Sequence, residues 1–156
     1  MKLVRLIALA AVAAFATSCL KKDLPELPVY DEALITNVYF EFRYKDPTTT
    51  SFDGQPLVRY VRLNVVKTIN AENNTVEARL TVPAASGSFT PEIRSTVSLS
   101  NLVGYCDIST AARMSPLGDS PKLGTPADFS KPREYMVVAA NGSSRRWTIS
   151  VVELNK

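Results

Sequence analysis

Histidine is absent from this chain of 156 residues, and its absence excludes more than any other feature of the composition. Without an imidazole there can be no Ser-His or Cys-His nucleophile pair and no zinc site that includes histidine. An enzymatic reaction would have to use carboxylates, tyrosines or lysines alone. We therefore expect a protein that is not an enzyme and that needs no cofactor and no metal.

Long apolar runs are also missing, apart from a single stretch near the start. Residues 6–16 form an unbroken apolar run of eleven residues. That is too short to cross a membrane, which takes about twenty residues. Because Lys2 and Arg5 precede the run, the pattern is that of a signal peptide and not of a permanent anchor.

The end of this run carries a cysteine preceded by small residues, in the order Ala16, Thr17, Ser18, Cys19. This motif resembles the bacterial lipobox, which implies cleavage before Cys19 and attachment of lipid to its thiol. The sequence then divides into a signal peptide (1–18), a lipidated tether (19–33) and one domain (34–156). The alternative is an ordinary secretory signal in which Cys19 has no such role.

Basic and acidic residues are nearly balanced once the predicted signal peptide is removed. Residues 1–18 contain Lys2 and Arg5, so the remaining chain has 16 basic and 15 acidic residues, a net charge of +1. No clustered basic face is apparent, and a nucleic-acid partner is therefore not expected. The expected partner is the membrane itself, through the N-terminal lipid.

Only one cysteine, Cys106, would remain if Cys19 is lipidated, so no intramolecular disulfide can form. The leading interpretation of Cys106 is a small buried apolar residue. A reactive or intermolecular thiol is the alternative, although no neighbouring lysine or histidine would stabilise its thiolate.

A helical period is absent as well, and the apolar residues instead recur at every second position. Alternation of this kind predicts strands that have one buried face. It is seen over residues 37–44, 57–66 and 76–82, around Val97 and Leu99, and over 135–139 and 147–151. Residues 109–131 show little period and are expected to form a long surface excursion.

Short strands separated by turns predict an all-β fold, specifically an immunoglobulin-like antiparallel β-sandwich of about seven strands. Turn signals support this prediction, because Asp53 precedes Gly54 and Asn141 precedes Gly142. By its parity with Ile149, Trp147 is expected to lie in the core.

The closing hairpin has a recognisable pattern: Asp128, Phe129 and Ser130, a strand led by Tyr135, a turn at Gly142 and a strand led by Trp147. It resembles the immunoglobulin-like domains of unknown function in Bacteroidetes-type surface lipoproteins. The resemblance implies a lipoprotein of the outer membrane, with display on the cell surface as the further expectation.

The outward face of the first two predicted strands is the candidate ligand site. If those strands pair, one surface carries aromatic, planar polar and charged side chains together, namely Tyr39, Glu41, Arg43, Tyr60, Arg62 and Asn64. A saccharide needs this combination, because rings stack on its C–H face while polar groups bond its hydroxyls. The alternative is an ordinary solvated sheet face with cross-strand pairs.

Two further sets of residues support other hypotheses. Met136 and Val138 are apolar where the resembling domains have polar residues, so they are a candidate face for docking another envelope protein. A carboxylate pair for glycan cleavage would come from Glu41, Asp46, Asp53, Asp107, Asp119 or Asp128.

Three functions are expected, in this order. The first is a lipid-anchored accessory module for binding or adhesion, with polysaccharide as a candidate ligand. The second is a structural or assembly partner of another envelope protein, and the third is a glycan-cleaving enzyme that uses carboxylates.

Overall fold

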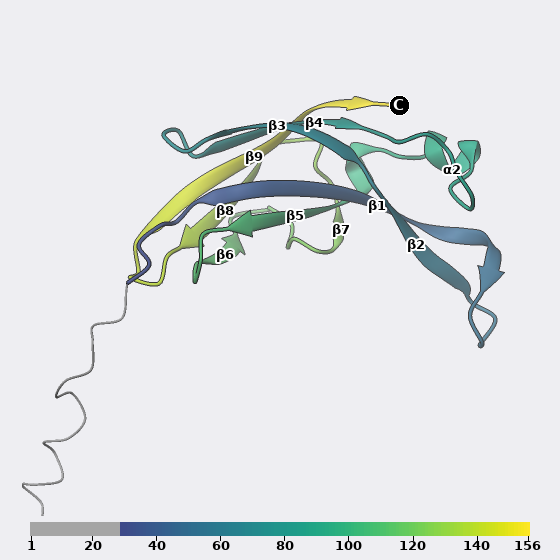
Figure 1. Cartoon of the computed structure of the whole chain (residues 1–156), viewed down its shortest axis with the longest axis horizontal. Coiled ribbons are helices and arrows are strands. Elements are labelled where there is room, and N and C mark those ends of the chain that lie inside the picture. The colour runs from purple at the N-terminus through teal and green to yellow at the C-terminus, as the bar shows by residue number, and fades with distance from the viewer. Residues whose placement is uncertain (1–28) are drawn as a thin grey trace, which may run out of the picture.

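A computed structural model describes residues 29–156, which form two β-sheets packed against each other (Figure 1). The predicted signal peptide, Cys19 and residues 20–28 of the predicted tether lie outside the described residues. Within the part described, no helix has both the length and the apolar character needed to cross a membrane.

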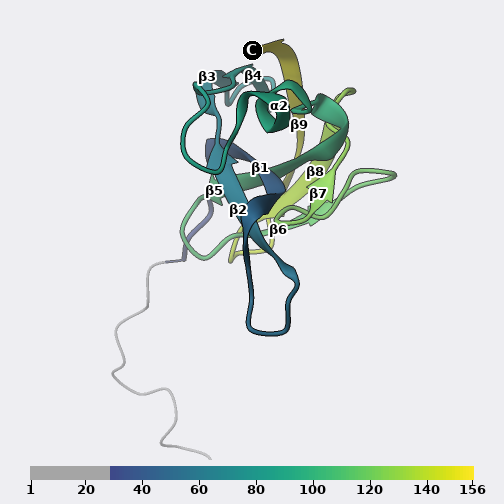
Figure 2. The ribbon, with the colours of Figure 1, turned by 90° about the vertical axis from the view of Figure 1, so that its right-hand side faces the viewer.

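The first sheet has the strand order β2-β1-β5-β7, and all of its pairings are antiparallel. Its strands are β1 (Ile35–Thr50), β2 (Pro56–Arg62), β5 (Leu102–Ile108) and β7 (Pro126–Ala127). The predicted hairpin of the first two strands is present as β1 and β2. Its end extends beyond the sandwich as an arm, most clearly in the view of Figure 2.

The second sheet has the order β3-β4-β9-β8-β6. Its strands are β3 (Asn64–Asn70), β4 (Thr75–Thr81), β9 (Ser144–Asn155), β8 (Arg133–Val138) and β6 (Arg113–Pro116). The pairing of β4 with β9 is parallel, whereas the other pairings are antiparallel. The predicted β-sandwich is confirmed, with nine strands in the described residues and one parallel pair.

Two of these strands lie in residues 109–131, where the sequence predicts only a surface excursion. Strand β6 has four residues and β7 has two. Segments this short cannot display a period of two, so their pairing with β8 and β5 is set by tertiary contacts.

The prediction of a strand around Val97 and Leu99 is wrong. The chain there forms a short helix, α2 (Pro91–Ser95), and a 3₁₀ turn, η1 (Leu99–Asn101). Thr90 caps the helix, since its Oγ1 accepts a hydrogen bond from the Ile93 amide at 3.3 Å. Val97 is nevertheless fully buried, so an apolar residue of this segment belongs to the core although the segment is not a strand.

The core lies between the sheets and contains the apolar residues that alternate in sequence. Val76, Ala78 and Leu80 of β4 are fully buried, as is Trp147 of β9. The rings of Phe40 and Phe129 meet edge to face, with their centroids 5.2 Å apart. The predicted core position of Trp147 is confirmed.

Residues just before β1 also pack on the domain, ahead of the predicted boundary at residue 34. The carbonyl of Ala33 accepts a hydrogen bond from Trp147 Nε1 at 2.9 Å, and Ala33 itself is buried. The carbonyls of Tyr30 and Asp31 accept hydrogen bonds from the Asn141 amide and the Ser143 hydroxyl, at 3.3 and 2.9 Å. The segment that follows residue 29 is therefore attached to the turn between β8 and β9.

Gly104 of β5 allows a close approach that no other residue would permit. A Cβ at this position would lie 2.8 Å from Cζ of Phe129, which is buried against Phe40. We expect Gly104→Ala to lower the free energy of unfolding by about 1–3 kcal/mol, measured by urea denaturation. Adding Phe129→Leu should recover part of the loss by removing the clashing ring edge. Simple additivity of the two changes would contradict this explanation.

Candidate functional site

The outward face of β1 and β2 forms as the alternation predicts. In the antiparallel register Glu41 lies opposite Arg62, and Arg43 lies opposite Tyr60. Together with Tyr39, these residues line an open groove with a volume of about 790 Å³. The structure thus brings together five of the six residues in the predicted set.

Asn64 does not share this face. The chain leaves the first sheet after β2 and enters the second sheet at β3, where Asn64 pairs with Thr81. Leu63 lies at the crossing, buried in the core, with its amide bonded to the Phe40 carbonyl at 3.0 Å. The predicted strand over 57–66 is therefore two strands in different sheets.

Strand β5 contributes two groove residues that sequence reasoning missed, Tyr105 and Asp107. In the pairing of β1 with β5, Tyr39 lies opposite Tyr105 and Asn37 lies opposite Asp107. The available signal was weak: polar residues at 105 and 107 alternate with the small or apolar Gly104, Cys106 and Ile108.

A hydrogen-bonded triangle forms the centre of the groove. Oε1 of the buried Glu41 accepts from Arg43 Nε at 2.9 Å and from the Tyr105 hydroxyl at 2.8 Å. Arg43 Nη2 also donates to the Tyr105 oxygen at 2.7 Å. The bond to Glu41 raises the pKa values of both Tyr105 and Arg43, so the phenol stays neutral and the guanidinium stays charged.

At one end of the groove the Tyr39 hydroxyl donates to Asp107 Oδ2 at 2.6 Å. This hydrogen bond is the main cause of the raised pKa of Tyr39. Lys67, from β3, bonds Asn37, and its Nζ lies 5.5 Å from the centre of the Tyr39 ring, a cation–π distance. These contacts hold Tyr39 in place.

On the β2 side the groove residues are less constrained. Tyr60 is 58% exposed, and Val58 is exposed beside it. Neither the Tyr60 hydroxyl nor the Arg62 guanidinium makes a side-chain hydrogen bond or ion pair within residues 29–156. This side of the groove therefore offers an aromatic ring and polar groups that remain available to a ligand.

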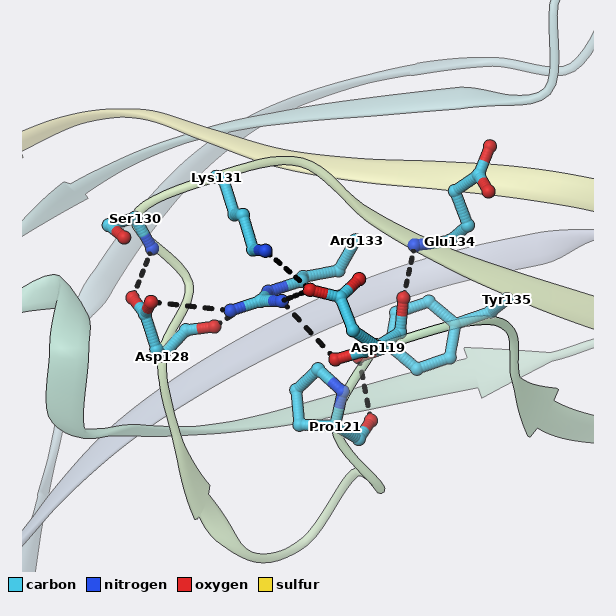
Figure 3. Close-up of polar contacts among 9 residues, drawn as sticks. Asp119, Pro121, Asp128, Ser130, Lys131, Arg133, Glu134 and Tyr135 are labelled. Atoms are coloured by element: carbon cyan, nitrogen blue, oxygen red, sulfur yellow. Dashed lines mark hydrogen bonds and ion pairs between the residues drawn. The ribbon is translucent and has the colours of Figure 1, made fainter.

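The loop that precedes β8 supports β5 from its outer side. Its strand β7 pairs with β5, and the Gly124 amide donates to the Gly104 carbonyl at 3.0 Å. Figure 3 shows how Arg133 holds this loop: its guanidinium bonds the Asp128 and Asp119 carbonyls and reaches both of their carboxylates. The Tyr135 hydroxyl donates to the Pro121 carbonyl at 3.0 Å in the same cluster.

The candidate carboxylates do not gather in one place. Glu41 and Asp107 line the groove, whereas Asp53 lies in the loop between β1 and β2. Asp119 and Asp128 surround Arg133 (Figure 3). Within residues 29–156 there is no cluster of acidic or thiol groups that could hold a metal ion.

Asp46 is buried and is bonded by Thr48 and Arg59. Its Oδ1 accepts from the Thr48 amide at 2.8 Å, and its Oδ2 pairs with Arg59. The Thr48 backbone bond and the Arg59 partner hold the pKa of this buried carboxyl well below its usual range. Asp46 therefore fixes the base of the hairpin arm as an ionised acceptor.

Met136 and Val138 lie on β8 between β9 and β6 and are half-buried. Strand β6 of the predicted excursion runs alongside them, with Ser115 opposite Met136 and Arg113 opposite Val138. The apolar area that these residues offer to a partner is correspondingly small.

Cys106 is half-buried and forms no disulfide within the described residues. Burial raises the pKa of its thiol to about 12. A thiolate is therefore not populated near neutral pH, which agrees with a packing role for this residue.

The fold and the groove together define a β-sandwich domain with a solvent-open groove on one sheet face. Residues 35–150 match the DUF5018-related family, and the chain belongs to that family. It is similar to a protein of Bacteroides fragilis NCTC 9343, described with its 1.81 Å crystal structure as a "putative secreted protein". The two are 43% identical with a TM-score of 0.75, over 83% of this chain and all of the relative. No curated protein matches this chain.

Proposed function

We propose that this protein is a non-enzymatic, lipid-anchored module of the cell envelope that binds a saccharide in the groove of β1, β2 and β5. The carrying observation is the exposed ring of Tyr60, placed beside polar side chains that the fold holds in position. Aromatic rings stack on the C–H faces of sugars, while carboxylate, phenol and guanidinium groups bond their hydroxyls.

The rigid centre of the groove supports binding over catalysis. Glu41 accepts hydrogen bonds from Arg43 and Tyr105 on the same oxygen, which fixes all three side chains before a ligand arrives. Preorganisation of this kind lowers the entropic cost of binding. A glycosidase would instead need one carboxyl group that is free to donate a proton to the leaving oxygen.

The proposed location at the outer membrane rests on the N-terminal sequence and on the relative. Cys19 follows a short apolar run and small residues, as in a lipobox, and the similar Bacteroides fragilis protein is described as a "putative secreted protein". Asp23 and Glu26 follow the cysteine and are compatible with display at the cell surface.

The proposal is tested by saccharide binding to residues 29–156. A chain of this extent is expected to fold without the N-terminal segment, because the crystallised relative matches over its whole length to 83% of this chain. On a glycan array followed by calorimetry, Tyr60→Ala should weaken binding about tenfold, because it removes the stacking ring. Phe52→Ala is the matched control, since Phe52 is fully exposed in the hairpin loop and lies outside the groove.

Two results would contradict the proposal. The first is an array on which the wild-type domain binds no saccharide. The second is an equal effect of Tyr60→Ala and Phe52→Ala on every ligand found, because that would place the binding surface elsewhere.

A further inference from the structure

The face that contains the groove carries more cations than anions. The groove is lined by the three arginines Arg43, Arg59 and Arg62, and Lys67 lies over the Tyr39 ring at one end, against the two lining carboxylates Glu41 and Asp107. This local excess of cations is larger than the net charge of +1 that the chain beyond residue 18 carries as a whole. An electrostatic preference for anions is the expected consequence.

Not all of these cations are available to a ligand. Arg43 is paired with Glu41 at 2.9 Å, and that carboxylate oxygen is shared with Tyr105. Arg62 lies directly opposite Glu41 in the register, yet the two form no ion pair, because the carboxylate is turned to Arg43. Arg59, the third cation of the lining, pairs with Asp46, so Arg62 is the lining cation that residues 29–156 leave without an anionic partner.

The position of Arg62 relative to Tyr60 fits one sugar unit. Residues two apart on a strand share a face and are separated by about 7 Å, which is close to the width of a pyranose with its substituents. A ring stacked on Tyr60 would place an exocyclic acidic group within reach of the guanidinium. The planar guanidinium bonds carboxylate or sulfate through two parallel N–H groups, which a lysine cannot do.

We propose that the groove selects anionic saccharides, with Arg62 binding the carboxylate or sulfate of a sugar that stacks on Tyr60. This inference rests on the saccharide-binding function proposed above. It adds a chemical class of ligand and a residue that determines specificity.

The test compares anionic and neutral polysaccharides on residues 29–156. The probes are polygalacturonate and heparin, with neutral galactan as the uncharged counterpart, and affinity is measured by calorimetry at low and high NaCl. At low salt the anionic probes should bind at least about tenfold more tightly than galactan, because one charge-assisted hydrogen bond contributes about that factor to the affinity. Raising the salt concentration should remove this difference.

Arg62→Gln should abolish the preference for the anionic probes, so that they bind no more tightly than galactan does. Arg113→Gln is the matched control, because Arg113 is an exposed arginine on β6 of the other sheet. It removes the same charge from the protein without touching the groove. Arg62→Lys should restore only part of the preference, since it returns the charge without the planar pair of donors.

Each outcome has a separate meaning. Equal binding of neutral and anionic probes that depends on Tyr60 would overturn the anionic preference and leave the proposed function standing. Binding of no probe and no array saccharide would overturn both. Salt-dependent binding of the anionic probes that responds equally to Arg62→Gln and Arg113→Gln would reflect overall charge alone and would also overturn the inference.

Discussion

Replacing Trp147 by alanine is expected to lower the free energy of unfolding by about 3–5 kcal/mol, the usual cost of truncating a large buried aromatic residue. Trp147 is fully buried on β9, where it faces the core between the two sheets. Because a domain of this size is stable by only about 5–15 kcal/mol, the variant should be close to unfolding at ambient temperature.

A second variant, Trp147→Phe, separates the hydrogen bond from the packing. It keeps an aromatic ring but removes Nε1–H, so the buried Ala33 carbonyl loses its donor at 2.9 Å. The additional cost of an unsatisfied buried carbonyl is about 1–3 kcal/mol. Hydrogen exchange at residues 30–34 should also rise, because this bond attaches the start of the domain to β9.

Both variants are measured by urea denaturation followed by far-UV circular dichroism, since Trp147 is the only tryptophan and its fluorescence is lost with it. Ser150→Ala on the same strand serves as the control, since Ser150 is only partly buried. A Trp147→Phe variant with wild-type exchange at residues 30–34 would contradict the role given to the Ala33 bond.

The predictable parts of the fold are the strands and turns whose own sequence reveals which residues are buried. In β4 the residues Val76, Ala78 and Leu80 are buried and alternate with exposed ones, as the sequence indicates. The turn at Asn141 and Gly142 joins β8 to β9, and Gly142 has the positive φ of 88° that favours glycine. Local patterning of this kind needs no knowledge of the neighbouring strands.

The crossing at Leu63 could not be predicted, for a physical reason. Val61, Leu63 and Val65 all face the core, because a strand that passes from one sheet to the facing sheet keeps its apolar side inward. The alternation is therefore uninterrupted, and no glycine or proline marks the change of sheet. The misplacement of Asn64 follows directly from this continuity.

The candidate site was only partly predictable, since it depends on a pairing between distant segments. The β1–β2 side of the groove follows from a hairpin, which is local in sequence. Tyr105 and Asp107 belong to the groove because β5 pairs with β1, although the two strands are far apart in the sequence. Glu41 and Tyr105, for example, are separated by 64 positions. Nothing in the local pattern indicates which strand will lie beside β1.

Replacing Arg133 by alanine is expected to lower the free energy of unfolding by about 2–4 kcal/mol, because several charge-assisted hydrogen bonds are lost together. Arg133 donates to the Asp128 carbonyl at 2.7 Å and to the Asp119 carbonyl at 3.3 Å, and its side chain is only 6% exposed. Both carboxylates are considerably more exposed and can regain water, which keeps the cost below that of a fully buried ion pair.

Lys131→Ala is the matched control, because Lys131 pairs with the same carboxylate, Asp119, but at the surface. Exposed ion pairs contribute about 0–1 kcal/mol, so this variant should remain close to wild type. Arg133→Lys should be intermediate, since an ammonium cannot reach two carbonyls and two carboxylates at once. Hydrogen exchange should increase in residues 117–132 for Arg133→Ala and not for Lys131→Ala. Equal losses of stability in the two alanine variants would show that net charge, and not the geometry of the buried guanidinium, holds this loop against β5.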